Sequence, residues 1–400
     1  MMRHLFTLMW NRRRANGLLV AEIFLAFVVL FAVSSIGINL WANYRQPLGF
    51  EYARAWQLNL TIGKQLKADQ LAILRQLLAQ LRTNPQIEGA ALTASNTPFS
   101  FNDSRRSLEF TDLQDSVKRP ISNINVYAVG PELREVMGLE LVAGRWFGPA
   151  DAVHSAQLPV VIDELMQRAM YPDGGSALGQ QLQPRDEMPQ RVIGIVRAFR
   201  TDGELQKPLP SVIQAIFPED TVFVAQSILL RVKPGSGAVL EKQIADQVRR
   251  LGPGWSGSIR TLSEMHASQV KQLLTRPLLL GTMSLFLLLN MALGLFGVLW
   301  QAINQRRAEM GVRRALGATA GAISRQIVGE VMVVTTFGMV LGLLVTVQFP
   351  LLGFMSTGWS VYLTGMALAI LLIYALTALC ALYPSRQAAG IHPAVALREE

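Results

Sequence analysis

The residue types that could do chemistry are few in this chain of 400 residues, and they do not gather in the sequence. No G-x-x-x-x-G-K-S/T phosphate-binding loop occurs, so we do not expect the chain to bind ATP by itself. The acidic residues between positions 41 and 276 are dispersed, with no pair that suggests acid–base catalysis. The histidines stand far apart and predict surface or core positions rather than a zinc site: His4, His154, His266 and His392.

Two further candidates have simpler explanations than catalysis. The segment Gly254 to Ser258 resembles the nucleophile turn of a hydrolase, but its last position is not glycine and no clear strand precedes it, so we interpret it as a loop. The single cysteine, Cys380, lies in an apolar run and excludes an intramolecular disulfide and a cysteine-based metal site. The sequence therefore predicts no catalytic residue, no cofactor-binding residue and no metal ligand. This favours a protein that moves and transmits force over an enzyme.

A short basic segment, Gln305 to Thr319, stands out instead because it lies between two long apolar runs. Residues 277–304 before it and 331–385 after it carry no charged side chain. A polar segment of this kind cannot lie in hydrocarbon, so it must form a loop at a membrane surface. The positive-inside bias of short loops predicts the cytoplasmic surface from these arginines: Arg306, Arg307, Arg313, Arg314 and Arg325.

The composition agrees with a membrane protein that carries one water-soluble region. Half of the residues are hydrophobic and 16% are charged, whereas about a quarter are charged in a typical soluble domain. The net charge of +9 could suggest nucleic acid. Arginines that flank apolar spans have a plainer explanation in membrane orientation, so no nucleic-acid partner is expected.

The apolar runs predict four transmembrane helices with both chain ends in the cytoplasm. The first span would measure about 35 Å, which is enough to cross the hydrocarbon core. Because it exceeds the apolar region of a signal peptide and lacks a clean A-x-A site, we interpret it as an uncleaved anchor. The predicted segments are a cytoplasmic amphipathic helix (1–17, or alternatively a disordered basic tail), spans 18–40, 277–303, 327–349 and 359–383, a periplasmic domain with stalk helices (41–276), a cytoplasmic coupling loop (304–326), a short periplasmic turn (350–358) and a cytoplasmic tail (384–400).

The large segment between the first two spans has the texture of an α+β domain. Leucines at helical spacing predict one helix at 65–82, and a second is expected at 238–251. Thr261 to Glu264 has the form of a capping box that starts a further helix. Pro277 would then be either a first-turn proline of the second span or a kink. Strands are expected at 90–93, 125–129, 160–162, 191–196, 212–217 and 227–232.

Within the spans, polar and small residues predict packing rather than transport chemistry. Glu22 lies in the first turns of its helix, where a structural role is favoured over proton transport. The spans lack the buried charges expected of an ion-coupled transporter. Small residues predict close helix packing, including self-association: Gly281, Gly294, Gly297, Gly338 and Gly342.

Several motifs resemble one known family. Glu309 to Thr319, followed by Ile323, Gln326 and Glu330, resembles the signature loop of the MacB/FtsX-like family of ABC transporter permeases. The segment Pro384 to Arg398 is similar to the C-terminus of the same family. Pieces of the domain after the first span resemble the MacB-type periplasmic core domain: 139–147, 160–164 and 192–196.

The resemblance implies a type VII ABC permease, in which four spans and a large outer domain form half of a dimer. Closure of a separate ATPase, which would bind the ATP and Mg, is passed through a cytoplasmic coupling helix and a stalk to the outer domain, a mode called mechanotransmission. By matching position, the ATPase-docking coupling helix would include Arg306, Arg307, Glu309, Gly311, Arg313, Arg314 and Gly317. Glu309 and Arg313, one helical turn apart, would form a stabilising pair.

The resemblance also implies partners and a location. The fused ATPase domain of some family members is missing from this sequence, so we expect an ABC ATPase subunit to supply it. The other expected partners are a second permease (identical or paralogous), membrane lipid, a periplasmic adaptor and an outer-membrane channel. The expected location is the bacterial inner membrane.

The sequence leaves two other functions open. One is a membrane-anchored sensor or scaffold that acts without an ATPase. The other is a lipoprotein-releasing permease, a narrower form of the main hypothesis. The sequence does not identify the cargo, because no binding pocket can be recognised in it.

Overall fold

The structure is a computed structural model that describes residues 13–100, 102, 104–111, 118–152, 156–184, 188–217, 226–353 and 358–389. For 13–16, 111, 118, 307, 308, 314 and 387–389 it describes the backbone only. The predicted amphipathic helix at 1–17 therefore lies largely outside the described residues, as does most of the C-terminal tail. The chain divides into two compact units: a membrane unit (Met1–Ala42 with Leu274–Glu400) and an inserted domain (Asn43–Leu273).

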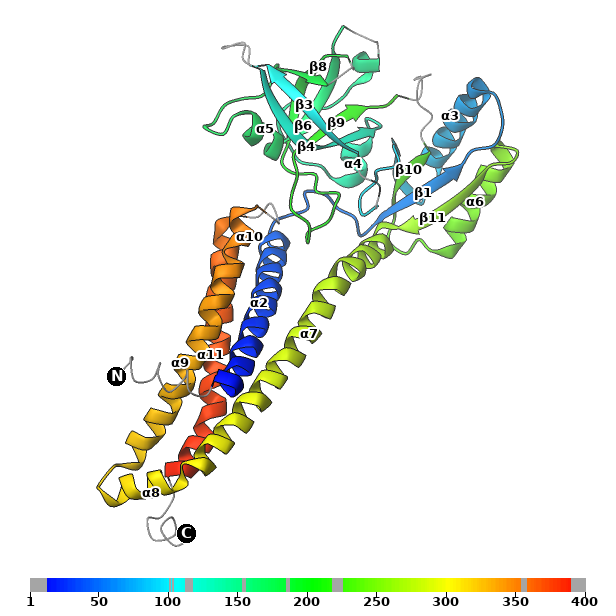
Figure 1. Cartoon of the computed structure of the whole chain (residues 1–400). Coiled ribbons are helices and arrows are strands. Elements are labelled where there is room, and N and C mark those ends of the chain that lie inside the picture. Colours follow the sequence, from blue (N-terminus) through cyan, green and yellow to red (C-terminus); the bar gives the residue numbers. More distant parts are fainter. Residues whose placement is uncertain are drawn as a thin grey trace. The chain divides into compact units, whose positions relative to one another are not determined.

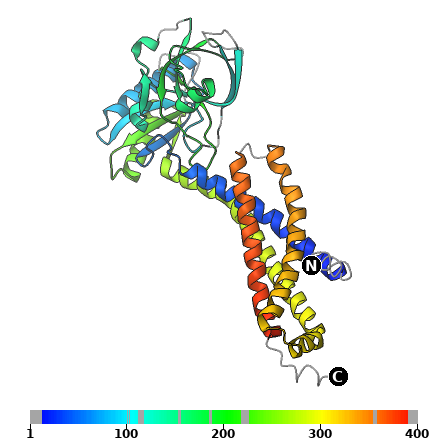
Figure 2. The same ribbon diagram turned by 90° about the vertical axis from the view of Figure 1, so that its left-hand side faces the viewer.

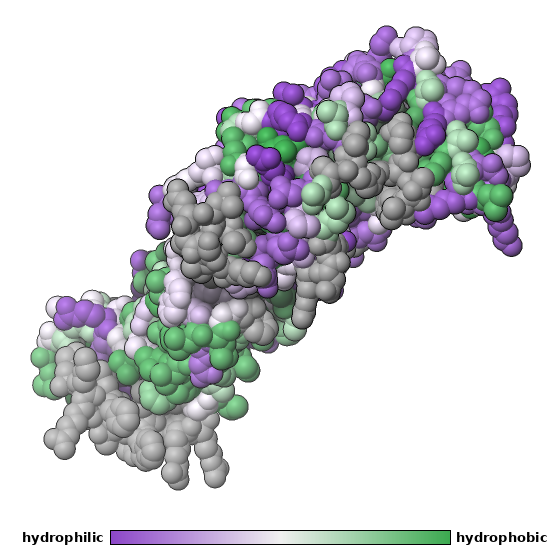
Figure 3. All heavy atoms as spheres, turned by 90° about the horizontal axis from the view of Figure 1, so that it is seen from above, coloured by the Kyte–Doolittle hydropathy of each residue, from purple (hydrophilic) through white to green (hydrophobic). Residues whose placement is uncertain are grey.

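The membrane unit consists of long helices that run side by side (Figure 2). Among the described residues, four helices are long and apolar enough to cross a membrane, as the sequence predicts. Hydrophobic side chains gather on the surface of this unit, whereas hydrophilic ones predominate over the inserted domain (Figure 3). The helices are α2 (Arg13–Tyr44), α7 (Leu262–Gln305), α9 (Ala320–Thr346) and α11 (Trp359–Ala389), with short helices α8 (Arg307–Ala315) and α10 (Gln348–Leu351) between them.

Glycines let α2 pack closely against its neighbours. A Cβ atom at Gly342 of α9 would lie 2.4 Å from the ring of Phe27, and one at Gly338 would lie 2.9 Å from Ile23. On α7, a Cβ at Gly294 would lie 2.6 Å from a carboxylate oxygen of Glu22. The expected close packing is thus confirmed at these three glycines. Gly281 and Gly297, by contrast, face open space among the described residues.

The helices extend beyond the predicted spans, because apolar composition marks only the part that crosses hydrocarbon. α7 is one helix from Leu262 to Gln305 with Pro277 inside it, so Pro277 is not a first-turn residue. The capping box at its start is confirmed, since Thr261 Oγ1 accepts from Glu264 N at 3.1 Å and Glu264 Oε2 accepts from Thr261 N at 3.3 Å. α9 begins at Ala320 rather than 327, and α11 runs through Pro384 to Ala389.

The first lobe of the inserted domain is a four-stranded antiparallel sheet with two helices on one face. Along the chain its elements alternate as β1 (Ala55–Thr61), α3 (Lys67–Thr83), β2 (Ile87–Thr93), β10 (Ser227–Val232), α6 (Ala238–Leu251) and β11 (Ser256–Thr261). The strand order β11-β1-β10-β2 is that of a ferredoxin-like βαββαβ unit. Figure 1 shows α3 and α6 together beside β1 and β11. Leucines of α3 pack with α6 and the sheet: Leu74, Leu77, Leu78 and Leu81.

The second lobe is inserted between β2 and β10 and forms a closed barrel (Figure 1). Its strands pair in the circle β4-β3-β7-β8-β6-β9 and back to β4. An apolar core that includes Phe110, Ile124, Val160 and Ile195 packs with α5 (Glu164–Met170). The remaining bounds are β3 (Arg105–Thr111), β4 (Lys118–Val129), α4 (Leu133–Met137), β5 (Leu141–Gly144), a 3-10 turn (Pro149–Ala152), β6 (Leu158–Asp163), β7 (Gln181–Pro184), β8 (Gln190–Val196) and β9 (Ser211–Ala215).

The predicted α+β class, both helices of the inserted domain and all six predicted strands are confirmed, although several bounds differ. Five strands were not predicted from the sequence: β1, β3, β5, β7 and β11. β1 looks too polar for a buried strand, yet its Gln57 is buried and donates to Thr97 and Asn59 at 2.7 and 2.9 Å. The interpretation of Gly254 to Ser258 as a loop is wrong at its end, because Ser256 opens β11 opposite Thr61.

A buried carboxylate joins the barrel to its helix. Asp163, 1% exposed at the end of β6, caps α5 by accepting from Met166 N at 2.7 Å through Oδ1, which also accepts from Ser211 N at 3.1 Å. Its second oxygen has no hydrogen-bond partner among the described residues. Burial raises the pKa of the Asp163 carboxyl to about 7, although these hydrogen bonds oppose the shift.

This raised pKa predicts a pH-dependent stability. Between its ordinary pKa of 3.8 and about 7, Asp163 holds a proton in the folded state that it releases on unfolding. The free energy of unfolding should therefore fall as the pH rises through this window, by at most about 4 kcal/mol. Asp163→Asn keeps the accepting oxygen and does not titrate, so the difference between wild type and variant in denaturant unfolding isolates this carboxyl. A difference that does not change between pH 4 and pH 7 would contradict the prediction.

Candidate functional site: the α8 corner

The α8 corner, residues 305–319, is shaped by stop and start signals in its own sequence. Gly317 adopts a φ of 93°, a left-handed conformation that favours glycine. Ala318 N then donates to Arg313 O at 3.0 Å, which closes α8 with a Schellman-type turn. Thr319 Oγ1 accepts from Ala322 N at 3.3 Å and caps α9. One helix thus ends and the next begins within a few residues, so α8 is held as a short separate helix.

A chain of polar contacts ties the α8 corner to α9. Arg306, partly buried, donates to Glu330 Oε2 at 3.1 Å, and Gln326 Nε2 donates to Glu330 Oε1 at 3.2 Å. Arg313 donates in turn to Gln326 Oε1 at 2.8 Å. The predicted pair between Glu309 and Arg313 is wrong, because among the described contacts the Arg313 guanidinium reaches across to α9 instead. Gln326 and Glu330 are one helical turn apart, which lets one face of α9 hold both ends of α8.

The two faces of α8 differ in burial. Met310 is buried and packs with the apolar core of the membrane unit, and Gly311 beside it is also buried. On the other face Val312 is 45% exposed and Leu316 is 83% exposed. The spacing of four residues places these two apolar side chains next to each other on the helix surface. The α8 corner therefore presents an apolar ridge, Val312 and Leu316, among charged neighbours.

The predicted docking residues take different places in this corner. Glu309 and Arg313 are exposed, Gly311 is buried, Arg306 turns towards Glu330, and Gly317 makes the turn. Arg307 and Arg314 lie in α8, but only their backbone is described. Sequence reasoning missed the ridge, whose signal was an apolar pair at i and i+4 within a highly charged segment.

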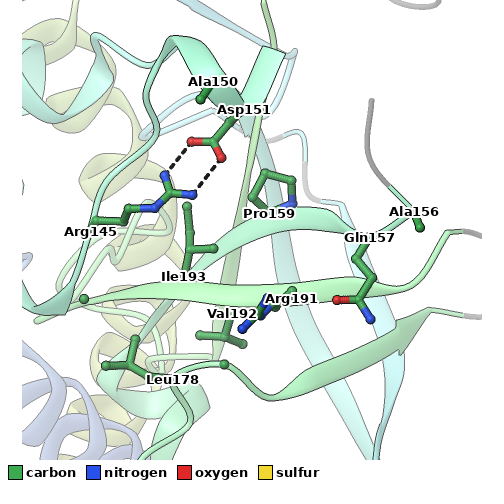
Figure 4. Close-up of a pocket in the computed structure, with 12 residues that line it drawn as sticks. Arg145, Ala150, Asp151, Ala156, Gln157, Pro159, Leu178, Arg191, Val192 and Ile193 are labelled. Atoms are coloured by element: carbon green, nitrogen blue, oxygen red, sulfur yellow. Dashed lines mark hydrogen bonds and ion pairs between the residues drawn. The ribbon is translucent and has the colours of Figure 1, made fainter. Parts of the chain in front are cut away.

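A second candidate is a cavity of about 760 Å³ in the barrel lobe (Figure 4). Arg145 and Asp151 lie on one side, joined by two hydrogen bonds of 2.6 and 2.8 Å, and Gln157 lies on the other. The bond from Arg145 lowers the pKa of the Asp151 carboxyl, although partial burial opposes it. Among the described residues, the cavity lining combines the pair of Arg145 and Asp151 with Arg191, Gln157 and apolar side chains. Across the described residues, no cluster of three or more His, Cys, Asp or Glu side chains could hold a metal ion.

Comparison with known proteins identifies the class. Residues 17–251 match the family model of the MacB-like periplasmic core domain, and residues 281–393 match that of the FtsX-like permease C-terminal domain. The first match alone covers more than half of the chain. The chain therefore belongs to the family of ABC transporter permeases that join a MacB-like periplasmic core domain to an FtsX-like permease domain.

Individual relatives agree with this family. The chain is 25% identical over 296 residues to the macrolide export ATP-binding/permease protein MacB of Bradyrhizobium diazoefficiens, covering 70% of this chain and 44% of that protein. It is 28% identical over 262 residues to MacB of Neisseria meningitidis, covering 62% of this chain and 37% of that protein. The chain thus spans less than half the length of these relatives. The crystal structure of the periplasmic region of MacB from Actinobacillus actinomycetemcomitans aligns with a TM-score of 0.38 at 16% identity, over 54% of this chain and 93% of that one.

The contact between Arg306 and Glu330 should hold the α8 corner against α9. Glu330→Gln removes the charge, and a partly buried ion pair of this kind contributes about 1 kcal/mol. We expect the amides of residues 306–318 to exchange about fivefold faster in hydrogen exchange followed by mass spectrometry. Glu309→Gln, at an exposed carboxylate of the same corner, is the matched control. Unchanged exchange in Glu330→Gln would show that the ion pair does not restrain α8.

Proposed function

We propose that this chain is the transmembrane subunit of an ABC transporter, and that a separate ATPase docks on the α8 corner. The observation that carries the proposal is the ridge of Val312 and Leu316, which points away from the core on a helix that is fixed to the bundle. Membership of the permease family supports the assignment, as do relatives named as ATP-binding/permease proteins.

The physical case for docking rests on the exposure of the ridge. A leucine that moves from water into an apolar groove gains about 1.5–3 kcal/mol. Short helices commonly bind by placing an apolar pair into the groove of a partner. Met310 and the link from Arg306 to Glu330 keep α8 attached to the membrane unit while Leu316 stays available. A push on the ridge would therefore reach α7 and α9 rather than bend a loose loop.

The proposed cycle is mechanical. ATP binding can shift a conformational equilibrium only if the ATPase contacts the permease differently in its two states, and the ridge supplies such a contact. The movement would pass along α7, a single helix of 44 residues that ends at the α8 corner. In this way ATP hydrolysis on a partner would drive a change in the inserted domain, for export or for handling of envelope cargo.

The proposed setting is a bacterial inner membrane with the inserted domain in the periplasm. The arginines of the α8 corner support a cytoplasmic position for this loop. Both chain ends would then be cytoplasmic, because four spans separate them. We further propose that a second permease, identical or paralogous, completes the transmembrane part, with membrane lipid around it. A periplasmic adaptor and an outer-membrane channel are candidate partners for the periplasmic side.

Leu316→Asp tests the docking ridge. A charge at this position opposes burial in an apolar groove, so co-purification of the ATPase should fall and ATP hydrolysis by the reconstituted complex should drop at least about tenfold. Val239→Asp is the matched control, since Val239 is also a highly exposed apolar residue but lies on α6 of the inserted domain. Co-purification and hydrolysis are measured for both variants.

Two outcomes would count against the proposal. If Leu316→Asp retains the ATPase and its activity, the ridge is not the docking surface. If no ATP-binding subunit accompanies the solubilised wild-type chain, a sensor or scaffold without an ATPase becomes the better description.

A further inference from the structure

The loop between β8 and β9 touches both helices that connect the inserted domain to the membrane unit. We call residues Phe199 to Gln206 of this loop the clamp loop. It leaves the barrel after β8 and returns to it at β9. Its contacts lie within one compact unit, which includes the last residues of α2 and the first turns of α7.

Arg200 is the centre of the clamp loop. Its side chain is buried, with the residue only 6% exposed, and burial lowers the pKa of its guanidinium although Glu204 opposes the shift. The guanidinium donates to Asn43 O at 3.2 Å and Gln46 O at 2.7 Å, at the end of α2. It also donates within its own loop to Gly203 O, Glu204 O and Gln206 O, at 3.5, 3.1 and 2.9 Å. One buried cation therefore holds the exit of α2 and the clamp loop together.

The clamp loop also forms hydrogen bonds with the first turns of α7. Glu204 Oε1 lies 2.7 Å from His266 Nε2, and the Gln269 side chain, 1% exposed, donates to Asp202 O at 3.1 Å. Gly203 has a φ of 83°, and a Cβ there would lie 2.8 Å from Gln269 Oε1. This glycine is required both by its backbone conformation and by the closeness of α7.

On its other side the clamp loop is fixed to the barrel. Asn125 of β4 donates to Asp202 Oδ2 at 3.1 Å, and Tyr127 of the same strand forms a hydrogen bond with Thr201. The Tyr127 ring also packs edge-on against Phe199, with ring centroids 5.0 Å apart. These contacts are largely buried, so the loop cannot shift easily without the barrel.

The order of the elements along the chain shows why the clamp loop matters: neither α2 nor α7 continues directly into the barrel. α2 leads through residues 45–54 into β1, and β11 leads directly into α7, so both helices continue into the ferredoxin-like lobe. The barrel is an insert in that lobe, and none of its described helices enters the membrane unit. Among the described residues, the clamp loop is the part of the barrel that holds the ends of α2 and α7 at the same time.

We propose that the clamp loop carries movement of the α2 and α7 ends into the barrel, with Arg200 as its positioning residue. This rests on the proposed mechanical function and names the part of the inserted domain that receives the motion. The helix ends and the barrel then move as one body.

Hydrogen exchange on the full chain in nanodiscs, without an ATPase, tests the clamp itself. Arg200→Gln removes most of the donors, and we expect amides in 43–50 and 199–206 and at the start of α7 to exchange at least about tenfold faster together. Arg200→Lys keeps the charge but not the fork, and should give a smaller increase at the same places. Arg197→Lys is the matched control, since Arg197 precedes the clamp loop and forms an exposed pair with Glu140 at 2.8 Å. Acceleration confined to 199–206 would overturn the proposal.

Spin-label distances in the complex separate this proposal from the proposed function. In a Cys380→Ser background, labels replacing Ser268 and Ser360 report the start of α7 against the membrane unit, and labels replacing Ser268 and Arg168 report the barrel against α7. The labelled chain is diluted with unlabelled chain, and both pairs are measured with and without ATP. The first distance should change with ATP, while the second stays narrow in wild type and broadens in Arg200→Gln.

Failure of the clamp-loop proposal and failure of the proposed mechanical function then give different results. A second distance that is as narrow in Arg200→Gln as in wild type would overturn the role of the clamp loop. If the first distance in the wild-type complex is the same with and without ATP, the mechanical function is overturned instead.

Discussion

A polar segment cannot remain in hydrocarbon, and the α8 corner shows how this chain meets that constraint. The corner stays attached to the bundle because Arg306 pairs with Glu330 and because Met310 is buried in the apolar core. Gly317 and Thr319 end α8 and begin α9, so the chain turns without extending either long helix. A surface loop is thereby converted into a rigid surface feature with an outward ridge.

At the other end of α7, the inserted domain also has to hold the helices that enter it. The barrel packs on the ferredoxin-like unit into which it is inserted, because β4 pairs with β2 and the two lobes share one apolar core. The ends of α2 and α7 need a separate attachment to the barrel. The buried guanidinium of Arg200 supplies this attachment for α2, because it donates both to backbone carbonyls at the end of α2 and to carbonyls of the clamp loop. Burying a cation is unfavourable unless it is hydrogen-bonded, and the two terminal nitrogens of Arg200 reach carbonyls at the end of α2 and in the clamp loop, a fork that lysine does not have.

The membrane part was the easier half to predict from sequence. Long uncharged runs are nearly sufficient to define spanning helices, and a basic loop between two of them can lie only at a surface. The strands β1 and β11 were missed because β1 buries Gln57 in a local hydrogen-bond set, and β11 is an edge strand of alternating small and polar residues. The position of the candidate site followed from charge and family motifs. Its orientation did not, because the partner of Arg306 lies 24 residues further along the chain. The clamp loop carried no sequence signal, since Arg200 donates to backbone carbonyls 157 and 154 residues away and the other contacts also join distant segments.

We propose that this chain receives energy from a separate ATPase through the α8 corner. Native mass spectrometry of the complex, extracted from its own membrane without an affinity partner, tests this most directly. We expect the mass of an ABC ATPase to accompany the chain, together with a second permease subunit. The Leu316→Asp complex should lack the ATPase and keep the second permease. A wild-type assembly that contains no ATP-binding subunit would contradict it.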